Sequence, residues 1–358
     1  MTLHIFNPDH DIALSSGLSN FTSPHAGRQL RHDLGWLPAL WASREDMVLV
    51  DDITMARNST RHRKVSTRNF IDKAYLAALP FSPECIAPWG WNAALRAQLL
   101  RMGLDESLLP SAEKIAVIRQ LSHRRTASQL LKELVTEGTV GESTECTSSE
   151  EVEAYLSSHG RIVVKAPWSS SGRGIRFVDS PAALHTPSFE GWLCNTLTQQ
   201  GSVMVEPYYN KVKDFGMEFH SDGKGNVSYE GLSLFQTTNG AYTGNIIATE
   251  KAKQELLANY IAPQLTERIQ SEVCSHLGQL FNGKYRGPFG IDMMIVAGTG
   301  SRSTCTLHPC VEINLRRTMG HVALALLPLL NPGNDDELMK AMRIEYTNNN
   351  YKLRIKQL

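Results

Sequence analysis

The chain has 358 residues, with 36 basic and 36 acidic side chains, so its formal net charge is zero. An apolar share of 42% is enough for a buried core and excludes a wholly disordered chain. The zero net charge removes the general attraction to polyanions, and the longest apolar stretch, 322–330, is well short of the ~20 residues that span a bilayer. We therefore expect neither a nucleic-acid nor a membrane partner.

Cysteine usage and the first residues indicate the compartment. Residues 1–11 lack the basic start and long apolar run of a secretory signal, and the six cysteines form no C-x-x-C pair. We expect reduced thiols in a cytoplasmic protein. Cys305 and Cys310 flank His308, which raises the question of a metal site, but their expected strand setting favours ordinary packing residues.

Residues 1–109 predict a small α/β domain. A short apolar start at 4–6 leads into the turn-rich segment 7–11, and the apolar run 47–50 is typical of a buried strand. Apolar residues at helical spacing predict helices at 23–34, 70–79 and 93–102.

Residues 110–201 predict a second unit. Ser111 is a candidate N-cap, and helices are expected at 112–121, 126–135 and 150–156. Two apolar strands, 161–166 and 174–178, flank the loop 168–173, which is rich in Ser and Gly. This spacing predicts a hairpin, whereas the phosphate loop of an α/β protein leads into a helix.

Residues 202–358 predict a third unit. Strands are expected at 202–206, 215–220, 227–235, 287–296 and 306–313, with a long helical region at 250–281. Helices at 322–330 and 335–342 follow, and the polar segment 348–358 is interpreted as a surface tail or an edge strand.

Lys165 ends a buried strand directly before the Ser- and Gly-rich loop. An ammonium in that position costs free energy unless it meets an anion. The loop offers backbone N–H groups and hydroxyls to phosphate oxygens. For this segment alone, a phosphate-binding loop and a solvated hairpin tip are equally compatible with the pattern.

Glu206 ends the next strand, just before a chain reversal. A glutamate in this position can hydrogen-bond a ribose or an adenine edge. Taken alone, it is better interpreted as an ordinary surface acid.

A stronger pattern joins Asp292, Glu312 and Asn314. Asp292 interrupts an apolar strand, and Glu312 and Asn314 stand two residues apart, hence on one strand face. If the two strands pair through the turn 298–301, the three side chains converge. Oxygen ligands of this kind suit Mg²⁺ (or Mn²⁺), whose shell phosphates usually complete. We predict a metal site here, with Arg316 or Arg317 beside it to hold a carboxylate or phosphoryl group.

This order of residues resembles the ATP-grasp superfamily over roughly 111–328. Glu113 and Lys114 resemble its early acid–lysine pair, although Arg119, Arg124 and Arg125 are alternatives for the same pocket. The other matches imply a role for each residue: Lys165 with Ser169, Ser170, Ser171 and Gly172 as the lysine and flexible loop, Glu206 and Glu218 as nucleotide-contacting acids, Asp292, Glu312 and Asn314 as metal ligands, and Arg316 as the substrate-facing arginine.

The resemblance implies a fold and an activity. The fold is α/β and α+β: a small N-terminal pre-ATP-grasp-like domain (1–109), then an N-terminal lobe (110–201) and a C-terminal lobe with C-terminal helices (202–358). The activity is an ADP-forming ligase that uses ATP and Mg²⁺ to join a small-molecule carboxylate to an amine (or thiol) through an acylphosphate. Lys165 and Arg316 are its expected catalytic residues. A small-molecule kinase and a non-catalytic ATP-binding module are the alternatives, and no signal for an oligomeric state is present.

Three further segments carry competing interpretations. Residues 7–11 either contact the substrate or form a structural turn. The basic segment 57–73 either binds an acidic partner or is a solvated loop, and the loop is favoured because few aromatics are present to stack bases. His321 is interpreted equally well as a substrate contact or as a capping residue.

Overall fold

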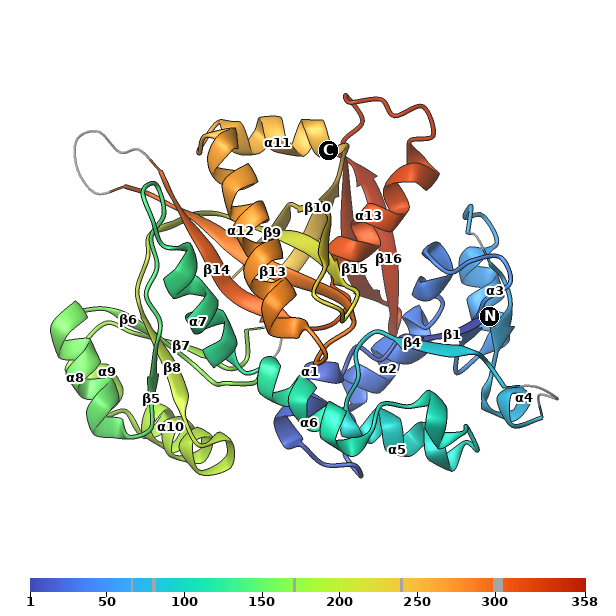
Figure 1. The fold of residues 1–358 in the computed structure, drawn as a ribbon, viewed down its shortest axis with the longest axis horizontal. Helices are drawn as coiled ribbons and strands as arrows, with labels where there is room; N and C mark the ends of the chain where they lie inside the picture. The colour runs from blue at the N-terminus through green and yellow to red at the C-terminus, as the bar shows by residue number, and fades with distance from the viewer. Residues whose placement is uncertain (66, 79–81, 170–171, 239–240, 299–304) are drawn as a thin grey trace. The chain divides into compact units, whose positions relative to one another are not determined.

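The computed structural model describes residues 1–358 except 66, 79–81, 170–171, 239–240 and 299–304 (Figure 1). The chain forms two compact units. Unit 1 comprises residues 1–120, 243–252 and 315–358, and unit 2 comprises residues 121–242 and 253–314. In the described part of the chain, no helix is both long and apolar enough to cross a membrane.

Unit 1 begins with a parallel sheet. Its strands are β1 (Thr2–Ile5), β2 (Met47–Leu49), β3 (Phe70–Ile71) and β4 (Cys85–Pro88), in the order β3-β2-β1-β4. The run around β2 is apolar throughout because both faces are covered: Met47 and Leu49 enter one core, and Val48 and Val50 enter the other.

Short helices follow the strands of this sheet. They are α1 (His10–Ser16), α2 (His25–Leu34), α3 (Ile53–Thr60), α4 (Lys73–Ala77), α5 (Ala93–Arg101) and α6 (Ala112–Leu121). Asp52, Asp72 and Asn92 begin α3, α4 and α5, each accepting a hydrogen bond from the backbone N–H three residues on, at 2.8–2.9 Å. Polar caps therefore collect at the carboxyl ends of the parallel strands.

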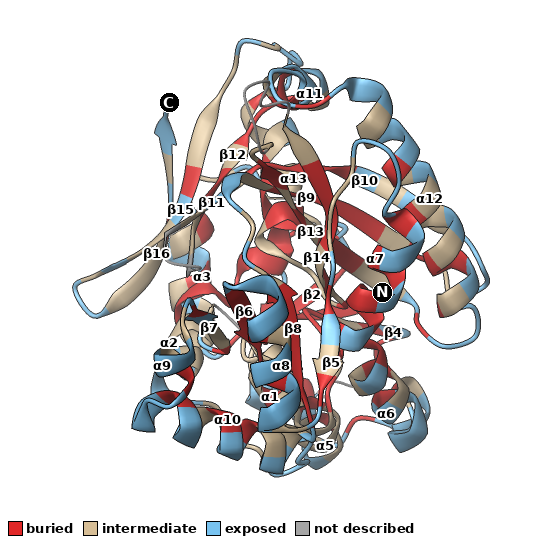
Figure 2. Cartoon of the chain, turned by 90° about the vertical axis from the view of Figure 1, so that its left-hand side faces the viewer, coloured by how far each residue is buried: buried red, intermediate tan, exposed pale blue. Residues whose placement is uncertain are grey.

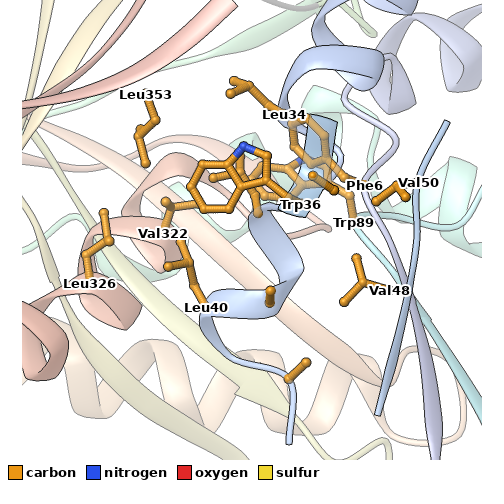
Figure 3. Close-up of a cluster of buried hydrophobic side chains, with 14 of the residues drawn as sticks. Phe6, Leu34, Trp36, Leu40, Val48, Val50, Trp89, Val322, Leu326 and Leu353 are labelled. Atoms are coloured by element: carbon orange, nitrogen blue, oxygen red, sulfur yellow. The ribbon is translucent and has the colours of Figure 1, made fainter. Parts of the chain in front are cut away.

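Later parts of the chain complete unit 1. The strands β12 (Ala241–Ile247), β15 (Lys340–Thr347) and β16 (Asn350–Gln357) pair antiparallel, and α13 (Met319–Leu330) precedes β15. The helix α11 (Glu250–Ala258) begins in unit 1 and continues into unit 2. One apolar core joins Phe6 and Trp36 to Val322, Leu326 and Leu353 (Figure 3). The early α/β sheet is thus buried by residues from the end of the sequence.

Unit 2 contains two antiparallel sheets. The first has the order β5-β8-β6-β7 and is covered by α8 (Ser149–His159), α9 (Pro181–Leu184) and α10 (Pro187–Gln200). Its strands are β5 (Thr144–Cys146), β6 (Ile162–Lys165), β7 (Ile175–Val178) and β8 (Val203–Pro207). The predicted hairpin around residues 168–173 is confirmed, since β6 and β7 pair antiparallel.

The second sheet has the order β10-β9-β13-β14. Its strands are β9 (Lys211–Ser221), β10 (Val227–Ser233), β13 (Gly287–Val296) and β14 (Thr306–Asn314), and β11 (Phe235–Thr238) follows β10. The helix α7 (Arg124–Leu134) packs against β14, and α12 (Pro263–Phe281) packs against β10. Figure 2 shows the central strands largely buried and α12 with an exposed outer face.

Several sequence predictions differ from the structure. The helix predicted at 335–342 is wrong, because residues from Lys340 onward form β15 between two partner strands. The segment 348–358 is an edge strand, one of its two interpretations. The helical region 250–281 is two helices, since Pro263 begins a new one, and 70–79 is a two-residue strand followed by α4. Residues 315–358 belong to unit 1, whereas the sequence grouped them with 202–314.

The basic segment 57–73 is largely ordered. Arg63 donates to the backbone carbonyls of Ser59 and Leu353, and Arg68 donates to those of Thr60 and Arg63. These arginines stabilise the connection between α3 and β3, so only part of the segment is solvated as predicted.

Candidate active site

Lys165 and Glu206 form a buried ion pair in the first sheet of unit 2. Lys165 lies opposite Met204, so Glu206, two residues further along β8, is its diagonal neighbour on the same face. The Lys165 ammonium donates to Glu206 Oε2 at 2.5 Å, and the two side chains are only 7% and 6% exposed. The two residues that the sequence associated with nucleotide binding therefore lie together.

The second sheet of unit 2 presents a row of oxygen donors. Asp292 lies opposite Glu312 on one side and Gly216 on the other, while Gly290 lies between Glu218 and Asn314. Residues directly opposite each other share a sheet face, and so do residues two apart. The four predicted side chains therefore share one face: Glu218, Asp292, Glu312 and Asn314.

Gly216 leaves room beside this row. A Cβ atom at this position would lie 2.8 Å from the carbonyl oxygen of Ile291 and 3.6 Å from Oδ1 of Asp292. Any larger residue would displace the backbone of β13 or crowd the Asp292 carboxylate. The absence of a side chain at position 216 thus keeps the carboxylate row accessible.

Arg124, at the start of α7, bridges the loop and the carboxylates. Its guanidinium donates to Ser169 Oγ at 2.8 Å, to Glu312 Oε1 at 2.9 Å and to the carbonyl oxygen of Ala166. Its side chain is 6% exposed, and Nε has no hydrogen-bond partner among the described residues. A buried guanidinium that bonds both elements has the chemistry of an anion ligand.

Lys114 is exposed on α6, in the part of the helix that belongs to unit 1. Within unit 2, Arg124, an alternative weighed from the sequence, is the basic residue that contacts Ser169 and Glu312. The sequence carries one physical signal for Arg124. This arginine begins α7, and a cation is unfavourable at a helix N-terminus because that end carries partial positive charge, so a role in anion binding is indicated.

The loop after β6 has well-defined stems. The backbone N–H of Ala166 donates to the carbonyl of Gly174 at 2.8 Å, and that of Ile175 donates to Gly172 at 3.2 Å. Gly172 has φ of +73°, a conformation that favours glycine. Ser169 contacts Arg124, whereas Ser170 and Ser171 lie outside the described residues.

His308 and Cys310 of β14 are buried among these charges. Burial raises the pKa of the Cys310 thiol, and the carboxylates of Glu206 and Asp292 raise it further. Burial lowers the pKa of His308 to about 4, and neither ring nitrogen has a hydrogen-bond partner among the described residues. The charges near Cys310 come from both sheets, and Arg124 bonds both the segment after β6 and Glu312 of β14. The ion pair and the carboxylate row are therefore parts of one candidate site.

The donor set fits a hard divalent cation that also binds phosphate. No group of three His, Cys, Asp or Glu side chains within the described ranges is arranged to hold a metal ion without help. Asp292 and Glu312 instead supply two carboxylates, and Asn314 supplies a carboxamide. One or two carboxylates, with substrate phosphates completing the shell, is the usual arrangement for Mg²⁺.

Arg316 lies in unit 1, where it forms a fork-like pair with Asp11. Its Nε and Nη2 donate to the two carboxylate oxygens at 2.8 and 2.7 Å, and Nη1 donates to the carbonyl of Arg317. His10, next to Asp11, is buried, and burial lowers its pKa to about 4. Asp11, from the turn-rich segment 7–11, therefore fixes the arginine that the sequence assigned to the substrate.

His321 has a structural role in α13. Its Nδ1 accepts from the backbone N–H of Thr318 at 3.1 Å, and the Thr318 hydroxyl accepts from the N–H groups of Gly320 and His321. This reciprocal arrangement is a capping box. Of the two interpretations from the sequence, the capping residue is confirmed.

Solved structures resemble the whole chain. N5-carboxyaminoimidazole synthetase from Staphylococcus aureus, complexed with ADP, has a TM-score of 0.53 at 13% identity, over 97% of this chain and 83% of that one. The biotin carboxylase domain of Hydrogenobacter thermophilus 2-oxoglutarate carboxylase, with MgADP, ADP and bicarbonate, has a TM-score of 0.54 at 14% identity, over 96% and 74%. Biotin carboxylase from Campylobacter jejuni has a TM-score of 0.52 at 13% identity, over 98% and 77%.

No family model and no curated protein sequence matches the chain. At 13–14% identity the structural likeness concerns the fold. It confirms the fold predicted from the residue order: a small N-terminal α/β domain and a two-lobed ATP-grasp fold.

Proposed function

We propose that the chain is an ATP-dependent ligase that joins a small-molecule carboxylate to an amine (or thiol) and releases ADP and phosphate. The observation that carries the proposal is that Arg124 links the loop after the buried Lys165–Glu206 pair to the carboxylate row of Asp292 and Glu312. The likeness to proteins solved with ADP and MgADP supports it.

In this proposal Lys165 and Arg124 bind the phosphates of ATP. Lys165 already meets a carboxylate and Arg124 already meets Glu312, so each cation can exchange an internal oxygen for a phosphate oxygen. Glu206 would then be released toward the ribose or the base. The Ser169 hydroxyl and the backbone N–H of Gly172 would add donors to the phosphates. In this proposal Arg124 has the role that the sequence analysis expected of Lys114.

The metal site in this proposal consists of Asp292, Glu312 and Asn314. A bound Mg²⁺ would neutralise phosphate charge as the γ-phosphoryl group transfers. Glu312 is 28% exposed and is the carboxylate that Arg124 holds in place, so it needs no large rearrangement to accept a cation. Glu218, buried on the same face, would complete the polar wall.

The proposed chemistry has two steps. A carboxylate oxygen of the first substrate attacks the γ-phosphorus, an O–P bond forms, the bridging P–O bond breaks, and ADP leaves. The amine nitrogen then attacks the carbonyl carbon, a C–N bond forms, the C–O bond to phosphate breaks, and the amine proton leaves with phosphate or solvent. Arg316, aligned by Asp11, would bind the substrate carboxylate through its guanidinium.

The test is a screen of amino acids and small carboxylates, in pairs with amines, for ADP release in the presence of Mg-ATP. A hit is repeated with hydroxylamine, which converts an acylphosphate into a hydroxamate. Hydroxamate formation supports the ligase. ADP release with a phosphorylated alcohol and no hydroxamate would identify a kinase instead, and Mg-ATP binding without ADP release from any acceptor would leave a non-catalytic module.

A further inference from the structure

A second concave site lies entirely within unit 1. It encloses about 680 Å³, within the roughly 300–1,000 Å³ typical of small-molecule pockets. Asn7 follows β1, Val50 and Asp51 follow β2, Asp72 follows β3, and Asn92 follows β4, and all of them line this crevice. It therefore lies at the carboxyl ends of all four parallel strands.

The sheet topology makes this edge a ligand-binding position. The chain passes from β1 to β2 and β3 on one side, and then returns to place β4 on the other side of β1. Connections on opposite sides of a strand leave a gap above its carboxyl end, where open α/β sheets bind ligands. The proposed ATP site uses none of these residues.

Basic side chains outnumber acidic ones in the lining. The basic residues are Arg28, Arg31, Lys73 and Arg101, and the acidic residues are Asp9, Asp51 and Asp72. The three acids already have partners: Asp9 accepts from the Ser23 hydroxyl, Asp72 accepts from the backbone of Tyr75, and Asp51 lies 3.9 Å from Arg31.

Lys73 and Arg101 differ from the other lining charges. Both are exposed, and neither has a hydrogen bond or an ion pair with any described residue. Arg28 and Arg31 each use part of their guanidinium, on Ser23 and Gln98, and retain further N–H donors. The crevice thus offers several cationic donors whose hydrogen-bonding capacity the described residues leave partly or wholly unused.

The lining includes both polar and apolar side chains. Asn7 is 2% exposed and is fixed by hydrogen bonds with the backbone of Gly90. Leu49, Val50 and Leu95 supply an apolar wall. The first turn of α5, which includes Ala94, also lines the crevice and adds the partial positive charge of a helix N-terminus.

We propose that this crevice binds a small organic anion, with a phosphate or carboxylate group held by Lys73, Arg101, Arg28 and Arg31 and its less polar part against Leu49, Val50 and Leu95. The binding claim concerns unit 1 alone, so it stands apart from the nucleotide chemistry proposed for unit 2.

The test measures binding of inorganic phosphate and of malonate to the full chain by isothermal titration, at constant ionic strength set with chloride. The decisive variant is Ala94→Glu, and the matched control is Ala93→Glu. Both positions are in the first turn of α5, where an added carboxylate favours the helix, but only Ala94 lines the crevice. Ala94→Glu should weaken binding about tenfold or more, and Ala93→Glu should leave it within about twofold.

A second pair removes charge instead of adding it. Lys73→Ala with Arg101→Ala should weaken binding at least about tenfold, whereas Arg57→Ala with Lys64→Ala, two exposed cations outside the crevice, should not. The probe that binds more tightly identifies the anionic group. Failure of both probes to bind better than chloride would overturn the proposal. So would equal binding by wild type and Ala94→Glu, since the anion would then be bound elsewhere, for example at the ATP site.

Discussion

Replacing Lys165 and Glu206 by methionine, singly and together, tests the buried ion pair. The two charges are 2.5 Å apart and their side chains are at most 7% exposed, so either one without its partner is a buried, uncompensated charge. Removing one partner of such a pair typically costs 3–5 kcal/mol. Methionine has a similar length and no charge, so the double variant should be within about 1–2 kcal/mol of wild type.

The assay is urea unfolding monitored by far-ultraviolet circular dichroism, with the free energy of unfolding in water obtained by linear extrapolation. Each single variant should lose about 3–5 kcal/mol of the free energy of unfolding. Because the double variant should stay close to wild type, the coupling energy between the two sites should be larger than either single loss. A double variant whose loss equals the sum of the two single losses would refute the argument. It would mean that Lys165 and Glu206 do not compensate each other's charge.

The double variant also separates stability from nucleotide binding. It keeps the packing but has no ammonium for phosphate, so ATP affinity should fall by roughly 1.5–3 kcal/mol, or about 10- to 150-fold. Unchanged ATP affinity in a folded double variant would remove Lys165 from the proposed site.

Three other predictions follow from single contacts. Glu312→Gln should stay folded, because the glutamine carbonyl oxygen can still accept a hydrogen bond from Arg124. It should nevertheless abolish the ADP release found in the substrate screen. Release at the wild-type rate would exclude Glu312 as a metal ligand. Asp11→Asn should raise the KM for the carboxylate substrate and leave ATP affinity unchanged, because it removes the carboxylate that pairs with Arg316. Equal KM values would contradict this role. Burial lowers the pKa of His308 to about 4, below the 6.5 of an unfolded histidine, so the unfolded state binds more protons and stability falls as pH drops through 6.5 toward 4. Between pH 7 and pH 5 the free energy of unfolding should therefore fall by about 2 kcal/mol less in His308→Leu than in wild type, as measured by urea titrations. An equal fall in both proteins would contradict the lowered pKa of His308.

Local pattern predicted the elements that determine their own structure. The hairpin strands around Lys165 and the strand pair that bears Asp292 and Glu312 are apolar runs bounded by turn residues, and both were found where expected. The alternation of side chains along a strand is sufficient to place Glu312 and Asn314 on one face. Fold and carboxylate row were thus accessible from the sequence.

Long-range partners account for what the sequence could not supply. The segment from Lys340 becomes a strand because β12 and β16 lie on its two sides, and such pairing overrides local helix preference. Arg124 is identified by contacts 42 to 188 residues away, with Ala166, Ser169 and Glu312. Four basic residues near position 119 offered the same chemistry, and only the packing of α7 on β14 distinguishes them.

The completion of unit 1 by the last residues of the sequence has a consequence during synthesis. Trp36 and Val48 emerge from the ribosome early, but their core also contains Val322, Leu326 and Leu353. At 5–20 residues per second, the early sheet waits on the order of 15–60 seconds for those side chains, with one apolar face uncovered. We expect nascent chains halted before residue 315 to bind chaperones that recognise apolar surface, and chains carrying the complete sequence to be released from them.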